Sequence, residues 1–85
     1  MNTRFPKPVA VSDAARSILV EDAESAAEFL LKRWPTFRGP RHADACAISL
    51  LVASGRETAS VAHAAFVAAA READILLPYP STAGT

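Results

Sequence analysis

Residues 22–35 read DAESAAEFLLKRWP, and this stretch constrains how the rest of the chain folds. Asp22 is a good N-cap, because its carboxylate can accept hydrogen bonds from the free amides of a first helical turn. Pro35 ends the helix, because the residue before a proline is pushed out of the helical region. Between them, apolar residues recur at the three- and four-residue spacing that places them on one side of a helix: Ala23, Ala26, Ala27, Leu30, Leu31 and Trp34.

Phe29 is the one large apolar residue of this helix that does not fit the stripe. At about 100° per residue it projects well to one side of the stripe. We therefore expect Phe29 to face a second contact surface.

The segment before this helix predicts a β-hairpin. Residues 8–11 alternate, with Val9 and Val11 on one side, and residues 16–20 end in β-branched and aliphatic side chains that suit a strand. Residues 12–15 are typical of a turn, and residues 1–7 of a short polar lead-in. A lone two-stranded hairpin is marginal in water, so it has to pack on a helix or pair with another strand.

Two further helices are expected after the Trp34-Pro35 stop. Residues 40–54 are apolar nearly all the way round after Asp44, which is typical of a helix buried on most sides, and Gly55 can end it. Thr58 can cap a third helix over residues 59–73. Residues 74–77 could add a short edge strand, and residues 78–85 are expected to be a disordered tail. The prediction is one α+β domain over residues 1–77, in the order ββααα with the second helix central.

Composition restricts both the location and the partners of this domain. The chain has 85 residues, is 51% hydrophobic, and balances nine basic with nine acidic residues. No apolar run reaches the roughly 18–20 residues of a membrane span, so no membrane association is expected. Cys46 is the single cysteine, which rules out an intrachain disulfide and suits the cytoplasm. A core this small is marginal, and self-association is the remedy that needs the fewest special residues.

Several motifs in fixed order resemble a known family. A proline-valine strand precedes a capped helix closing at Trp34-Pro35; Gly39-Pro40 opens a helix that ends at Gly55, and Ala65-Phe66 lies in the last helix. This order resembles the short bacterial proteins grouped as domain of unknown function 982, over roughly residues 5–77. The resemblance implies a fold and no particular activity. Asp74 departs from it, since a glycine is expected where the last helix ends.

His42 and Cys46 stand four residues apart, on one face of the second expected helix. That spacing can chelate a metal, with His63 as a conceivable third ligand, or pair a nucleophile with its base. A metal site needs more ligands, and catalysis needs an orienting group and a cavity. We therefore expect no metal, no cofactor and no enzymatic activity, with Cys46 as a small buried apolar residue.

A candidate interaction surface surrounds the loop between the first two helices. Trp34 and Phe37 bracket this loop; they could form an aromatic platform, although Trp34 at the end of the stripe is better explained as core. Arg33, Arg38 and Arg41 make a local basic cluster, which could bind an anion or an acidic partner. The candidate interaction residues are Phe29, Trp34, Phe37, Arg38, Arg41 and His42.

The sequence supports two functions from different classes. The first is a non-catalytic protein-interaction or regulatory module, a homodimer that pairs through an edge strand, a helix face, or both. The alternative is a small nucleic-acid-binding regulator that uses the arginine cluster. Nucleic acid ranks second because the net charge is zero, and because the third helix offers only Arg71 where a groove-reading face carries several Arg, Lys, Asn or Gln residues.

Overall fold

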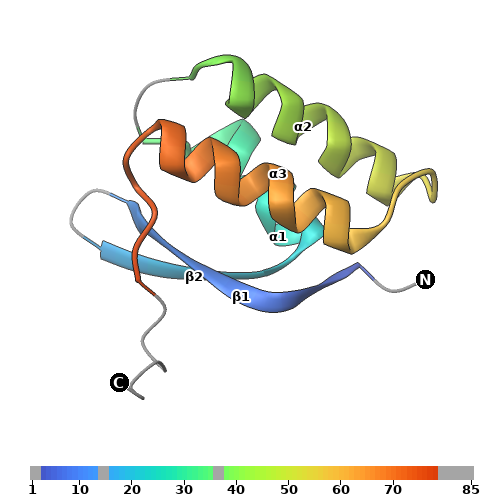
Figure 1. The fold of residues 1–85 in the computed structure, drawn as a ribbon, viewed down its shortest axis with the longest axis horizontal. Helices are drawn as coiled ribbons and strands as arrows, with labels where there is room; N and C mark the ends of the chain where they lie inside the picture. Colours follow the sequence, from blue (N-terminus) through green and yellow to red (C-terminus); the bar gives the residue numbers. More distant parts are fainter. Residues whose placement is uncertain (1–2, 14–15, 36–37, 79–85) are drawn as a thin grey trace.

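The computed structural model describes residues 3–13, 16–35 and 38–78. Figure 1 shows a two-stranded hairpin in one layer, with the helices stacked on one of its faces. This is the α+β arrangement, a β-hairpin followed by three helices, that the sequence predicts. The elements in chain order are β1 (Arg4–Asp13), β2 (Arg16–Asp22), α1 (Ala23–Glu28), the π-helix η1 (Phe29–Arg33), α2 (Pro40–Ala53) and α3 (Ala59–Glu72).

The hairpin is antiparallel and longer than expected. Ala10 lies opposite Leu19 and Ser12 opposite Ser17. The expectation of a polar lead-in over residues 1–7 is wrong, because β1 begins at Arg4 and Phe5 is buried. The ring of Phe5 packs against Phe66 of α3, with the ring centroids 6.2 Å apart. Residues 14–15 of the expected turn lie outside the described residues.

Residues 75–77 contact the outer edge of β1 without forming a strand. Leu76 makes an isolated antiparallel bridge with Val11. The Ser12 N–H donates to the Ile75 carbonyl at 2.8 Å, and the Leu77 N–H donates to the Ala10 carbonyl at 2.9 Å. Within the described part of the chain, the C-terminal edge strand is thus reduced to one bridge, which covers part of the β1 edge.

The first helix begins where the sequence predicts but changes its pitch. Ala26, Leu30 and Trp34 are buried as expected, whereas Leu31 is 49% exposed and Phe29 only 3% exposed. The expectation that Phe29 faces a separate contact surface is therefore wrong. From Phe29 onward the helix is a π-helix, whose hydrogen bonds span five residues instead of four. The buried side of the helix is therefore turned toward Phe29 and away from Leu31, relative to the predicted stripe.

The helix at the centre of the fold is α3, and the expectation that α2 is central is wrong. Phe66 of α3 is fully buried, and the rings of Phe5, Phe29 and Trp34 surround it. In Figure 1, α3 lies between the hairpin and α2. Since α2 is on the far side of α3 from the sheet, it buries one side only and leaves Leu50 56% exposed.

Candidate functional site

The structure divides the described candidate interaction residues into two groups. Phe29, Trp34 and His42 are buried in the chain, and Arg38 and Arg41 are exposed. Phe37 lies outside the described residues. The buried members form one ring cluster: Trp34 is 5.5 Å from Phe29 and 5.0 Å from His42, measured between ring centroids. Phe29 and Trp34 also pack against Phe66, so the described aromatic candidates belong to the core.

His42 has a structural task in this cluster. Its Nε2 lies 2.7 Å from the carbonyl oxygen of Leu30. Because a carbonyl only accepts, Nε2 carries the hydrogen and donates it. Leu30 lies in η1, and the residue five positions further on is Pro35, which has no N–H to donate. The imidazole of α2 thus supplies a donor where the π-helix meets a proline.

Cys46 lies against the ring of His42, and its thiol has a raised pKa. Its Sγ is 3.8 Å from both Nδ1 and Nε2 of His42, at the long limit of a thiol hydrogen bond. Burial raises the pKa of the Cys46 thiol, and the nearby positive charge of Arg38 opposes that rise without cancelling it. A thiol with a raised pKa is a poor nucleophile at neutral pH, because the thiolate is the reactive form.

No metal-binding group is assembled in the residues that the structure describes. Among them, no cluster of three or more His, Cys, Asp or Glu side chains could hold a metal ion. His63, the third ligand that the sequence suggested, instead packs its ring edge-on against Phe5 of β1, at a centroid distance of 5.3 Å.

The arginine cluster is partly engaged by the protein's own carboxylates. The Arg33 guanidinium lies 3.3 Å from the Asp13 carboxylate at the end of β1. The backbone N–H of Arg41, in the first turn of α2, donates to Glu72 Oε1 at 3.0 Å. A carboxylate of α3 therefore occupies the position at the start of α2 where an external anion would bind.

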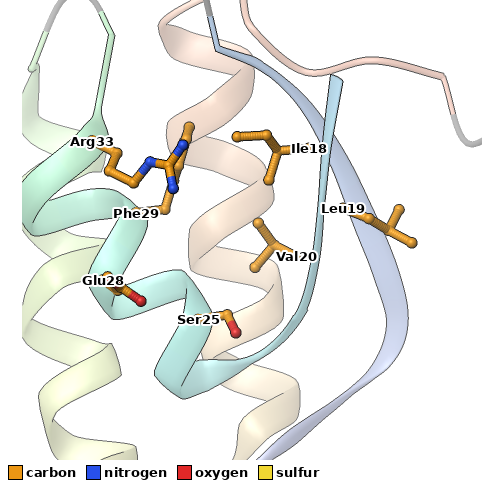
Figure 2. A pocket seen from close by; sticks show the side chains of 7 residues that line it. All are labelled: Ile18, Leu19, Val20, Ser25, Glu28, Phe29 and Arg33. Carbon is orange, nitrogen blue, oxygen red and sulfur yellow. The ribbon is translucent and has the colours of Figure 1, made fainter. Parts of the chain in front are cut away.

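A pocket that the sequence did not predict lies between β2 and the first helix. Figure 2 shows Ile18 and Val20 pointing toward α1 and η1, while Leu19 points to the opposite side of the strand. The pocket has a volume of about 190 Å³, with Phe29 in its lining and Arg33 at one end. The alternation of Ile18, Leu19 and Val20 is the sequence signal that places two of these side chains on one side of the strand.

A second hollow, of about 180 Å³, lies between α1 and α2. Its walls are mostly apolar, with Ala23 and Ala27 from α1 and Leu50 and Ala53 from α2. Ser49 also lines it, and the Ser49 hydroxyl is buried with no hydrogen-bond partner among the described residues. The alanine side chains make the hollow, because they fill little of the space between the two helices.

One comparison identifies the family of this chain. The fold is a small α+β domain with exposed apolar side chains and a buried His42 that bonds to the Leu30 carbonyl. The sequence profile of the family described as Protein of unknown function (DUF982) matches residues 7–77, and the chain belongs to this family. Neither a curated protein nor a solved structure matches it. Within the described residues, no helix is long and apolar enough to cross a membrane.

Proposed function

We propose that this chain is a non-catalytic protein-interaction module that works as a homodimer. The observation that carries the proposal is the exposure of large apolar side chains on the described surface. Leu19 of β2 is 46% exposed, Leu31 of η1 49% and Leu50 of α2 56%, and Leu51 and Val61 are also exposed. These side chains lie on several elements, and on a domain this small they leave apolar surface that a partner could cover.

The size of the domain supports the same proposal. A chain of 9.0 kDa buries only about 60–65% of the surface that its unfolded form exposes. The alanine-rich helices add little apolar volume per residue, and the rest of the chain covers only one side of α2. A second copy would bury some of the exposed leucines and so stabilise the fold without a disulfide or a metal.

The state of the reactive groups supports a non-catalytic role. The His42 Nε2–H is committed to the Leu30 carbonyl, and burial raises the pKa of the Cys46 thiol. The two residues therefore lack the activated thiolate on which nucleophilic catalysis depends. The free thiol of Cys46 also supports our proposal that the protein works in the cytoplasm, a reducing compartment.

Sedimentation velocity at tens of micromolar tests the proposal. We expect one species with twice the 9.0 kDa mass of the chain, dissociating as the protein is diluted. A single monomeric species over the whole concentration range would show that the chain is not a homodimer.

Nucleic-acid binding is the second candidate, with one supporting observation. Arg41 and Arg71 border the same surface hollow near the start of α2. Glu72 also borders that hollow and bonds to the Arg41 amide, and the net charge of the chain is zero. Titrating the protein into a labelled DNA duplex at low and at moderate salt distinguishes the two proposed functions. Binding that weakens as salt rises favours a nucleic-acid-binding regulator. No binding at low salt eliminates that function.

A further inference from the structure

The two edges of the hairpin differ in how well they are protected. The outer edge of β1 carries Pro6 and Pro8, is irregular between Arg4 and Val9, and bonds to residues 75–77. Prolines, bulges and covering segments are the devices that prevent a strand edge from pairing with another chain. The centre of β2, residues 18–20, has none of these. Among the described residues, no backbone hydrogen bond joins this part of β2 to any segment except β1.

The hydrogen bonds on β1 show which backbone groups β2 presents at its open edge. The Ala10 carbonyl and the Ser12 N–H both bond to residues 75–77, so they point away from β2. In an antiparallel pair, two directly opposite residues either exchange backbone hydrogen bonds or both point their N–H and C=O groups away from the partner strand. Leu19 and Ser17, which lie opposite Ala10 and Ser12, therefore point their N–H and C=O groups outward. By alternation along the strand, Glu21 does the same.

We propose that a second copy of this chain adds its own β2 to this edge, antiparallel, with Leu19 on the two-fold axis. The inference rests on the proposed homodimer and names its interface. In this register Leu19 faces Leu19 of the second copy, and Ser17 faces Glu21 of the second copy. These pairs use the outward-pointing residues of each strand and exchange both of their hydrogen bonds.

Charge complementarity selects this register. β2 has the sequence RSILVED, with a basic first residue and two acidic last residues. Centring the pair on Leu19 places Arg16 opposite Asp22 of the second copy at both ends of the ribbon. A shift of the strand by two residues toward its acidic end would place Glu21 opposite Leu19 and leave Ser17 without a partner. Opposite charges across a strand pair stabilise it, by about 0.2–1 kcal/mol per pair.

The pocket beside β2 suits the side chains that the second strand would bring. Ile18 and Val20 point toward the first helix (Figure 2), and Phe29 contributes an apolar wall to the pocket of about 190 Å³. In the proposed register Ile18 lies opposite Val20 of the second copy, on the side of the sheet that faces the helices. The incoming Ile18 and Val20 extend the core through this pocket, while the two Leu19 side chains meet on the opposite side of the sheet.

Site-specific crosslinking tests the interface separately from the dimer. In a Cys46→Ser background, Leu19→Cys brings two thiols together across the axis, because Cα atoms of such a pair are about 5.5 Å apart. A thiol-to-thiol maleimide crosslinker with a short spacer should convert most of this variant into covalent dimer. Leu50→Cys is the matched control, because Leu50 is at least as exposed as Leu19 but lies on α2, and it should give little covalent dimer. Efficient crosslinking at position 50 and none at 19 would overturn the strand pairing and leave the homodimer intact.

A charge on the axis provides the second test. Leu19→Lys places two ammonium groups against each other, and we expect the dimer dissociation constant to rise at least tenfold, measured by sedimentation velocity. Leu50→Lys should leave it unchanged. Both side chains are exposed, so circular dichroism should show the same fold in each variant. A Leu19→Lys protein that dimerises normally would overturn the inference, and a wild-type chain that is always monomeric would overturn the homodimer with it.

Discussion

Asp74 shows how one residue can depart from the family pattern and keep its geometry. It has φ 61°, the left-handed region that glycine normally occupies where a helix ends. The Asp74 N–H donates to the Arg71 carbonyl at 3.1 Å, and the Ile75 N–H donates to the Ala70 carbonyl at 2.9 Å. These are the two bonds of the Schellman motif. The glycine expected from the resemblance is thus replaced by an aspartate in the conformation of a glycine.

Asp74→Gly should therefore stabilise the protein. A side chain in the left-handed region carries a steric cost that glycine lacks, and we expect the free energy of unfolding to rise by about 0.5–1 kcal/mol. Urea denaturation followed by circular dichroism measures it. Ala73→Gly is the control: Ala73 has φ −85°, so glycine there should lower the stability. Stabilisation by both substitutions would contradict this account.

His63 gives the stability a dependence on pH. Burial lowers the pKa of His63 below its ordinary value of 6.5, and the positive charge of Lys7 lowers it further. At pH above 6.5 the imidazole is neutral in both folded and unfolded chains. As pH falls through the unfolded value toward the lower folded one, the unfolded chain binds the proton more readily, so stability is lost. We expect a lower urea midpoint near pH 5 than near pH 8, with a smaller difference in His63→Gln than in the wild type. An equal difference in both proteins would assign the pH dependence to other groups.

At the scale of elements, the junction between η1 and α2 depends on one hydrogen bond. His42→Phe keeps an aromatic ring in the cluster but removes the donor to the Leu30 carbonyl. Leaving a buried acceptor without its partner costs about 1–3 kcal/mol, and we expect a loss of this size in urea denaturation. Cys46→Ala, which removes only the long thiol contact, should cost less. A His42→Phe variant as stable as wild type would show that the ring matters and the hydrogen bond does not.

Element boundaries were predictable from the sequence where a local signal sets them. The Asp22 carboxylate accepts from the Ser25 N–H at 2.7 Å, and the Thr58 hydroxyl accepts from the Val61 N–H. Gly55 ends α2 with φ 77°, and Trp34 before Pro35 is extended. Each boundary depends on residues within one helical turn of it, so the sequence is enough to predict it.

The orientations of the helices were not predictable in the same way. Phe29 and Leu31 are both large and apolar, and the choice between them depends on a π-helix that a 100° periodicity does not represent. In α2, apolar residues on every side made the helix look central, yet its buried side includes His42 and Ser49 while Leu50 is exposed. Phe5 was missed because residues 1–7 were interpreted as a polar lead-in, whereas β1 begins at Arg4 and is irregular between Arg4 and Val9. For the candidate site, the sequence indicated Trp34 as a core residue. It indicated neither the contacts of Trp34 with Phe29 and His42 nor the pocket beside β2, which exists only once α1 packs on the hairpin.

For the whole molecule, the marginal core and the open β2 edge have one thermodynamic consequence. If the folded chain is stabilised by a second copy, unfolding is coupled to dissociation, and the thermal midpoint depends on protein concentration. We expect the midpoint to rise by about 5 °C for a hundredfold increase in concentration, given the entropy of unfolding of a domain this size. Differential scanning fluorimetry over that range measures the rise. Leu19→Lys, which leaves the core untouched, should lower the midpoint at each concentration, whereas Leu50→Lys should keep the wild-type values. A midpoint independent of concentration in the wild type would mean that the monomer is stable alone, despite its small core.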